Sequence, residues 1–308
     1  MRALVATGKG ELGLEWGEVP APEPSPNQAV VAVRAVSLNR GEVRRLARAT
    51  PGLVPGWDVA GVVSQPAGNG TGPPEGSRVV GLVPSGAWAE QAVVDATLLA
   101  ALPEEVSFEA ASTLPVAGLT ALNALRLGGF LVGARVLVTG AAGGVGRFAV
   151  QLGALAGADV VAVVGSPERA EGLAELGASE VIVGDADPGG GFDLILESVG
   201  GDSLSRSLAA VAGFGTVVYF GMSSGDHAVV ESTWYGDHAG ARLYALRVFD
   251  ELLRNQRGAR DLALLARLVA EGRLDTQVSM TTSWRDPAAA LEGLMARKVK
   301  GKAVLSID

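Results

Sequence analysis

The chain has 308 residues, of which 48% are hydrophobic and 19% are charged, and its formal net charge is −8 at pH 7. This composition excludes a disordered chain and is typical of a globular protein of about two domains. Its 43 glycines follow no three-residue period, which excludes collagen. The negative net charge argues against sequence-independent binding of nucleic acid or of an anionic membrane, so we expect neither as a partner.

The residues that usually hold zinc or form disulfides are nearly absent. The chain has no cysteine and two histidines, His227 and His238, so disulfides and thiolate catalysis are excluded and no metal site is predicted. The first residues lack the apolar stretch of a signal peptide, and no later apolar segment reaches about 20 residues. We therefore expect a cytoplasmic protein whose chemistry depends on a cofactor or on ordinary polar groups.

Residues 1–105 contain short β-rich segments separated by turn-forming residues. The expected strands are 29–38, 58–65, 77–83 and 87–94. Strands of this length between frequent turns predict a small β-barrel or sandwich.

From about residue 106, apolar strands alternate with glycine turns and helical patterns. The predicted strands are 135–140, 159–165, 180–184, 192–200, 215–221 and 243–248, and the clearest helical patterns are 146–157 and 167–178. Continuous apolar strands that alternate with helices predict a parallel sheet covered on both faces, which is the doubly wound α/β class.

The C-terminal part follows a different pattern. A helical region is expected at 249–271, interrupted at Arg257 and Gly258, and a second helix at 287–297. The last strand, 302–307, has no place in the parallel sheet, so we expect the chain to return to its first domain. The predicted domains are 1–105 completed by 275–308, and 106–274.

The most specific motif is a glycine turn within 135–165. A strand leads into a tight turn of small residues at the positive end of the following helix, an arrangement that favours a dinucleotide pyrophosphate, with a mere packing turn as the alternative. The fingerprint G-x-G-x-x-G/A maps onto 141–146, with alanine in the first glycine position. The candidate cofactor-binding residues are Ala142, Gly143, Gly144 and Val145.

The choice between NAD and NADP is made at the end of the second strand, at Gly165 and Ser166. A carboxylate there would repel a 2′-phosphate, whereas a serine hydroxyl with Arg169 one turn along offers a donor and a positive charge. NADP(H) is therefore favoured, although two glutamates lie nearby. Ser166 could also cap a helix that begins at Pro167.

Taken together, motifs along nearly the whole chain resemble the medium-chain dehydrogenase/reductase superfamily, and within it the zinc-free quinone oxidoreductase-like branch. The resemblance implies a GroES-like β-barrel catalytic domain, made from the N-terminal part and the C-terminal tail, around a Rossmann domain. It also implies a homodimer formed through strands 215–221 and 243–248. The motifs that carry it are 32–46, 55–63, 76–82, 86–94, 114–122, 141–146 and 197–201.

The zinc ligands of other members of this superfamily have no counterpart here. Zinc-containing relatives carry a histidine in a Gly-His-Glu motif, and the matching residues are Gly56, Trp57 and Asp58. The expected cysteine ligand is absent as well. Alcohol oxidation at a catalytic zinc is therefore not expected.

Asn39 resembles the family asparagine near the nicotinamide and the substrate. It is the candidate for polarising the substrate carbonyl or for orienting the ribose and the nicotinamide amide, and a turn-forming asparagine is the alternative. Arg297, in the tail, resembles a cofactor-contacting arginine. The other cofactor-binding residues that the resemblance implies are Thr120, Ser198, Val199, Phe220, Gly221 and Met222.

These features lead to the hypothesis of an NADPH-dependent, zinc-independent reductase of a quinone or an α,β-unsaturated carbonyl compound. Hydride addition to such a substrate gives an enolate that water can protonate, so a dedicated acid is not obligatory. None of the three tyrosines is followed by a lysine four residues later, so the short-chain dehydrogenase pair is absent. An enoyl reductase with an acyl or polyketide-derived substrate and a non-catalytic NADPH-binding protein remain alternatives.

Overall fold

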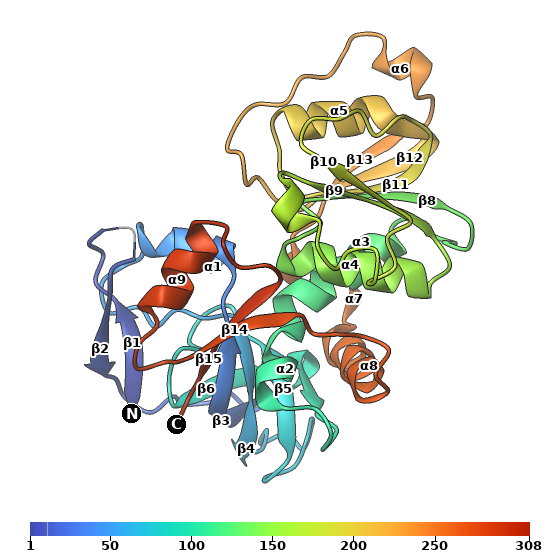
Figure 1. Ribbon diagram of the computed structural model, residues 1–308. Coiled ribbons are helices and arrows are strands. Elements are labelled where there is room, and N and C mark those ends of the chain that lie inside the picture. Colours follow the sequence, from blue (N-terminus) through green and yellow to red (C-terminus); the bar gives the residue numbers. More distant parts are fainter. Residues whose placement is uncertain (11) are drawn as a thin grey trace. The chain divides into compact units, whose positions relative to one another are not determined.

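The chain forms two compact units in a computed structural model that describes residues 1–10 and 12–308 (Figure 1). The first unit contains Met1–Leu119 and Asn255–Asp308, and the second contains Thr120–Arg254. The stretches 106–119 and 255–274, which the sequence pattern placed in the nucleotide-binding domain, thus lie with the first unit.

Helix α8 (Gly258–Ala270) shows why the chain divides there. It buries Leu262 and Leu265 completely. A Cβ atom on Gly258 would lie 2.4 Å from the Cδ2 atom of Leu98, so the helix starts in close contact with the first unit. Apolar packing assigns this helix to the first unit. The alternation of strands and helices along the sequence does not reveal this packing.

A seven-stranded sheet organises the first unit. Its strands follow the order β14-β15-β3-β4-β5-β7, and β6 also pairs with β3. Neighbouring strands are antiparallel except β14 and β15, which are parallel. The bounds are β3 Gln28–Ser37, β4 Asp58–Gln65, β5 Arg78–Leu82, β6 Gln91–Asp95, β7 Leu99–Ala101, β14 Val278–Ser283 and β15 Lys302–Ser306.

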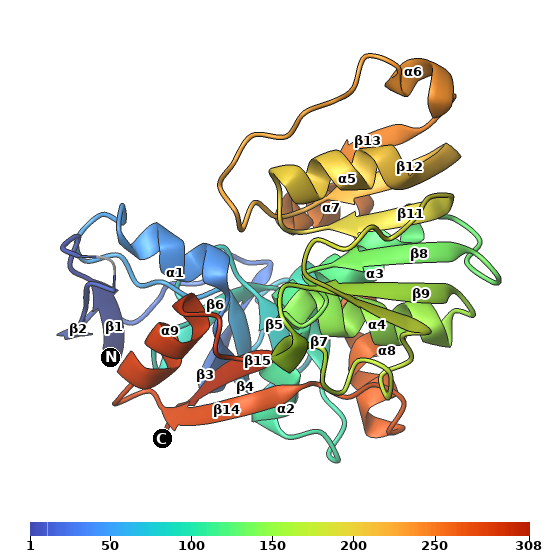
Figure 2. The ribbon, with the colours of Figure 1, turned by 45° about the horizontal axis from the view of Figure 1, so that its top comes forward.

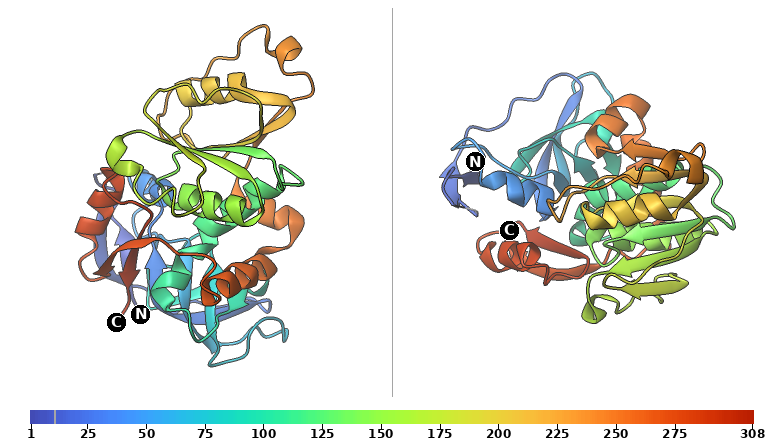
Figure 3. Two further views of the ribbon diagram at one scale, coloured as in Figure 1. Left: turned by 45° about the vertical axis from the view of Figure 1, so that its right-hand side comes forward. Right: turned by 90° about the horizontal axis from the view of Figure 1, so that it is seen from above.

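The C-terminal tail returns to the N-terminal part, as predicted from strand 302–307, which had no place in the parallel sheet. β15 pairs antiparallel with β3, with Val304 opposite Ser37. Figure 3 shows the red C-terminal strands beside the blue N-terminal strands. The core beneath them includes two tryptophans without solvent exposure, Trp88 and Trp284.

Smaller elements complete the first unit. Strands β1 and β2 form a separate antiparallel pair, and α9 contacts α1. The bounds are β1 Arg2–Ala6, β2 Leu14–Glu18, α1 Arg40–Leu46, the 3₁₀ helix η1 Ala96–Leu98, α2 Phe108–Ser112, the π-helix η2 Leu114–Gly118 and α9 Ala288–Met295.

A six-stranded sheet organises the second unit. Its order is β10-β9-β8-β11-β12-β13 and every pair is parallel, which is the doubly wound order with β8 as its first strand. Figure 2 shows α5 along β11 and β12. The bounds are β8 Arg135–Thr139, β9 Asp159–Val164, β10 Glu180–Val183, β11 Phe192–Glu197, β12 Val211–Tyr219, β13 Arg242–Ala245, α3 Leu119–Arg126, α4 Gly144–Leu155, the 3₁₀ helix η3 Pro167–Arg169, α5 Asp202–Ala210, α6 Trp234–Asp237 and α7 Val248–Asn255.

One predicted helix is wrong. The pattern at 167–178 forms only the three-residue η3 and a series of turns. Gly172 and Gly177 there have φ angles of 78° and 105°, which lie in the left-handed region and interrupt a right-handed helix. Among the described residues, no helix combines the length and apolarity needed to cross a membrane.

Candidate functional site

The glycine turn joins β8 to α4 in the second unit. Gly140 has a left-handed φ of 59°, and α4 begins after Gly143, its N-cap. A Cβ atom on Gly146 would lie 2.6 Å from the Cα atom of Ala141 and 2.6 Å from the carbonyl oxygen of Gly140, too close for non-bonded atoms. Only glycine allows this packing of helix on strand, which is the role of the third glycine in the dinucleotide fingerprint.

The turn fits a dinucleotide pyrophosphate. Ala142 is buried, whereas Gly143, Gly144 and Val145 are partly exposed at the N-terminus of α4. The first N–H groups of a helix have no partner within the helix, and the helix dipole adds positive potential there. Because Gly143 and Gly144 have no side-chain carbon, the backbone of this turn can serve as a cradle for an anion.

Ser198, after β11, lies against the glycine turn, and Gly221, after β12, lies against Ser198. The Ser198 hydroxyl donates to the carbonyl oxygen of Thr139 at 3.0 Å, and a Cβ atom on Gly140 would lie 2.5 Å from that hydroxyl. A Cβ atom on Gly221 would lie 2.7 Å from the carbonyl oxygen of Ser198. The two glycines thus allow three strand ends to meet at Ser198, flanked by Val199, Phe220 and the exposed Met222.

Glu197 is a site residue that the sequence interpretation missed. Its fully buried carboxylate accepts hydrogen bonds from Thr139 Oγ1 at 3.1 Å, Val199 N at 3.1 Å, Gly200 N at 2.9 Å and Ser203 Oγ at 2.7 Å. A buried carboxylate with this many donors fixes the loop that follows β11. The signal that could have found it is an acidic residue directly at the end of an apolar strand.

The end of β9 carries the predicted determinants of cofactor choice. Ser166 precedes η3, but its side chain makes no capping hydrogen bond, so the alternative role as a side-chain cap is wrong. Gly165 is exposed, and a Cβ atom there would meet no atom within 4 Å. Arg169 lies partly buried on the same short turn.

A buried charged cluster surrounds Asn39 in the first unit. This Asn39 cluster consists of Ser37, Asn39, Glu42, Asp58 and Lys302, which come from the end of β3, from α1 and from the first residues of β4 and β15. Glu42, Asp58 and Lys302 are 3%, 0% and 2% exposed. Charged side chains are rarely buried this deeply unless they are paired.

All polar atoms of the Asn39 side chain are engaged inside the cluster. Its Nδ2 group donates to Asp58 Oδ2 at 2.8 Å and to Glu42 Oε1 at 3.1 Å. Its Oδ1 atom accepts a hydrogen bond from Lys302 Nζ at 2.7 Å. The backbone N–H of Asn39 donates to Glu42 Oε1 at 2.7 Å, which ties the start of α1 to its own third residue.

Asp58 and Lys302 link the cluster to the surrounding backbone. Asp58 Oδ1 accepts from Val116 N at 2.8 Å, and Oδ2 accepts from the Ser37 hydroxyl and lies 3.6 Å from Lys302 Nζ. Lys302 Nζ also donates to the carbonyl oxygen of Leu38 at 3.1 Å. Asp58 is thus part of a salt-bridged network that joins β3, β4 and β15.

Burial shifts two pKa values in the cluster. Loss of water, followed by repulsion from Asp58, raises the pKa of Glu42 to about 8, against the opposing effects of Lys302 and the Asn39 N–H donors. Loss of water also lowers the pKa of Lys302, and attraction to Asp58 and Glu42 opposes this. The ionisation of the cluster is therefore sensitive to pH.

The remaining predicted residues lie in different units. Thr120 is buried in α3 of the second unit. Arg297 follows α9 in the first unit, is exposed, and has a φ of 59°, a left-handed conformation that is uncommon for arginine. Among residues 1–10 and 12–308, no group of three or more His, Cys, Asp or Glu side chains could hold a metal ion.

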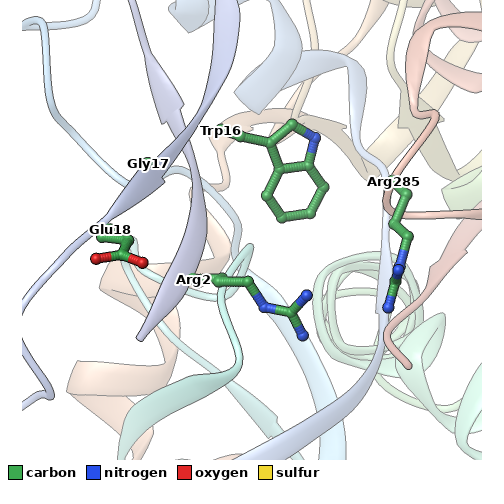
Figure 4. A pocket seen from close by; sticks show the side chains of 5 residues that line it. All are labelled: Arg2, Trp16, Gly17, Glu18 and Arg285. Carbon is green, nitrogen blue, oxygen red and sulfur yellow. The ribbon is translucent and has the colours of Figure 1, made fainter.

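A surface pocket of the first unit contains none of the predicted site residues. It has a volume of about 420 Å³ and is lined by Arg2, Trp16, Gly17, Glu18 and Arg285 (Figure 4). Arg2 is paired with Glu90 at 2.7 Å, and Arg285 lies 3.2 Å from Asp308. Because both arginines are already paired with carboxylates, the pocket has no surplus of positive charge.

Comparison with known proteins relates this chain to dehydrogenases. Residues 25–104 match the alcohol dehydrogenase GroES-like domain, and residues 156–305 match the zinc-binding dehydrogenase family. A mycobacterial protein, Rv1454c, whose structure is complexed with NADPH, has a TM-score of 0.88 and 26% sequence identity, with 99% of each chain covered.

Two curated relatives are similar in sequence. The spectinabilin polyketide synthase system protein NorB of Streptomyces orinoci is 34% identical to this chain over 94% of the chain's residues. The chain spans 14% of the length of NorB. The chloroplast envelope quinone oxidoreductase homolog of Arabidopsis thaliana is 40% identical over 57% of this chain and 58% of its own length. Together with the two matched domains and the glycine turn, these similarities show that the chain belongs to the medium-chain dehydrogenase/reductase superfamily, in its zinc-free quinone oxidoreductase-like branch.

Proposed function

We propose that the protein is an NADPH-dependent, zinc-independent oxidoreductase that transfers a hydride to a quinone or an α,β-unsaturated carbonyl compound. The observation that carries the proposal is the glycine cradle at α4, where Gly146 permits a contact that any other residue would block. The similarity to quinone oxidoreductases supports the substrate class.

The residues of this chain bind and orient, and the bound dihydronicotinamide supplies the hydride. The turn at 142–145 would hold the pyrophosphate through backbone N–H groups. Ser198 and Gly221 shape the carboxyl edge of the sheet, where ligands of doubly wound folds bind. Ser166 and Arg169 would bind the 2′-phosphate in this proposal, and Asn39 would contact the nicotinamide end. Thr120 and Arg297 complete the proposed contacts with the cofactor.

A second candidate is an enoyl reductase with an acyl or polyketide-derived substrate. The similarity to NorB over 94% of the chain favours it specifically. Both candidates deliver a hydride to a carbon conjugated with a carbonyl group, and they differ in the shape of the substrate.

The test is a titration of the protein with NADPH and NADH, followed by absorbance at 340 nm with quinones, enones and enoyl thioesters under the same conditions. Turnover with quinones or enones supports the first candidate, and turnover confined to enoyl thioesters supports the second. Binding without turnover across the panel contradicts both enzymatic candidates. No binding of either nucleotide would overturn the assignment of the glycine cradle.

Ser166→Asp is expected to reduce the preference for NADPH over NADH about 10- to 100-fold, since a hydroxyl donor is lost and a carboxylate repels the 2′-phosphate. The measurement is the ratio of kcat/KM values for the two nucleotides. Ser25→Asp adds the same charge at an exposed position of the first unit and serves as the matched control. An unchanged ratio in Ser166→Asp contradicts this role for Ser166.

The proposed homodimer uses the edge strand β13. β13 ends the six-stranded sheet, and its Leu243 is 49% exposed, so this edge offers unpaired backbone groups and an apolar side chain. We expect a sedimentation mass of two chains for the wild type and of one chain for Leu243→Lys at micromolar concentration. A wild-type mass of one chain contradicts the dimer.

A further inference from the structure

Charged groups on β4 and β15 impose one orientation on the side-chain amide of Asn39. Its Oδ1 atom faces the ammonium of Lys302, a donor only, and its Nδ2 group faces the carboxylate of Asp58 and the carboxyl group of Glu42. A flip of the amide would turn N–H groups toward the ammonium and a carbonyl oxygen toward the carboxylate of Asp58. Charge, rather than shape, therefore fixes this amide.

Lys302 is the group that selects the orientation at Oδ1. Its ammonium donates hydrogen bonds to Asn39 Oδ1 at 2.7 Å and to the Leu38 carbonyl oxygen at 3.1 Å, and it forms an ion pair with Asp58 Oδ2 at 3.6 Å. The side chain is 3% exposed, so the ammonium interacts with protein atoms rather than with bulk water. It is the first residue of β15, so the C-terminal tail delivers it to the end of β3.

The hydrogen bonds of Asn39 also limit what it can offer to a ligand. Both Nδ2 hydrogens are used inside the cluster, whereas Oδ1 accepts a hydrogen bond from Lys302 Nζ with one of its two lone pairs. Asn39 is partly exposed, unlike the charged side chains around it. The available group is thus an acceptor.

We propose that Lys302 is a positioning residue that holds Asn39 so that Asn39 meets its ligand only as a hydrogen-bond acceptor. The ligand group is then a donor, such as a ribose hydroxyl or the N–H of a carboxamide, and not the carbonyl oxygen of the substrate. The proposal rests on the proposed function, because it takes Asn39 to face the nicotinamide end. The competing explanation is that Lys302 only balances the buried charge of Asp58.

The kinetic test compares Lys302→Met with the charge-balanced Lys302→Met/Asp58→Asn. The methionine keeps much of the length of the side chain without its charge, and the double variant removes the ion pair as a whole. We expect kcat/KM for NADPH to fall about 10- to 100-fold in both, while the double variant recovers thermal stability. Recovery of stability together with kcat/KM would show that Lys302 acts only through charge balance and would overturn the proposal.

A double-mutant cycle separates action through Asn39 from a general effect. In an Asn39→Ala background, Lys302→Met is expected to change kcat/KM for NADPH less than twofold, because the group that it positions is gone. An equally large loss in both backgrounds contradicts the proposal. Lys9→Met, at an exposed lysine of the same unit, is the matched control.

A measurement without catalysis keeps this inference distinct from the proposed function. The side-chain amide signals of Asn39, identified in ¹⁵N NMR spectra by their loss in Asn39→Ala, should exchange slowly with solvent in the wild type. We expect Lys302→Met to speed this exchange at least about tenfold and Lys9→Met to leave it unchanged. Unchanged exchange in Lys302→Met contradicts the positioning role, whereas slow wild-type exchange without any nucleotide binding contradicts only the proposed function.

Discussion

Asp58→Ala is expected to lower the free energy of unfolding of the first unit by about 3–5 kcal/mol, the usual cost of breaking a buried ion pair by removing one partner. The substitution leaves the ammonium of Lys302 buried at 2% exposure without its carboxylate. It also removes the acceptor of Ser37 Oγ, Asn39 Nδ2 and Val116 N. Each donor left unsatisfied adds a desolvation cost.

The measurement is urea unfolding followed by tryptophan fluorescence. Four of the five tryptophans lie in the first unit, so this signal reports mainly on the unit that contains Asp58. The matched control is Asp185→Ala, which breaks an exposed ion pair with Arg206 at 3.0 Å and should cost less than about 1 kcal/mol. A similar, small loss in both variants would show that the buried pair contributes no more than a surface pair.

The second large effect is a fall in stability with rising pH that depends on Glu42. Its pKa is raised to about 8 in the folded protein, from 4.5 in the unfolded chain, so the folded state holds the extra proton between these values. The contribution of Glu42 to stability is therefore complete below about pH 4.5 and is lost as the pH rises through 8. The full loss amounts to at most about 5 kcal/mol, at 1.36 kcal/mol for each pKa unit.

The test compares the free energy of unfolding of the wild type and Glu42→Gln at pH 5, 6.5 and 8.5. The difference between the two should shift in favour of the variant as the pH rises, because glutamine has no proton to lose. The lowered pKa of Lys302 has the opposite sign, with stability rising toward pH 10.5, and Asp58 and Lys302 remain in both proteins. Glu23→Gln, at an exposed site, should show no such shift, and a pH-independent difference for Glu42→Gln contradicts the prediction.

Sequence patterns were informative where structure is local. The strands β8, β9 and β11 follow from continuous apolar runs, and the glycine turn follows from small residues between a strand and a helix. The same local reasoning failed at 167–178, because a helical spacing of apolar residues does not show that glycines will adopt left-handed angles. It also did not single out the short strand β2, which is half exposed and has little periodicity.

Some residues of the candidate site could likewise be found from local sequence patterns, and others could not. Asn39, Ser198 and Gly221 could be found from motifs, since each lies at or just after the end of a predicted strand. Glu197 lies next to Ser198 and still escaped notice, because its importance comes from donors on β8 and on the loop after β11. A hydrogen-bond network of this kind appears only when the strands are side by side.

The sequence by itself determined the doubly wound sheet and the glycine turn between β8 and α4, because each depends on residues that are close along the chain. Only the tertiary structure decided what surrounds Asn39. Lys302 lies 263 positions away in the sequence and reaches Asn39 because β15 pairs with β3. The physical reason is that the register of a long-range strand pair, together with burial, sets which charges meet, and no local pattern encodes it.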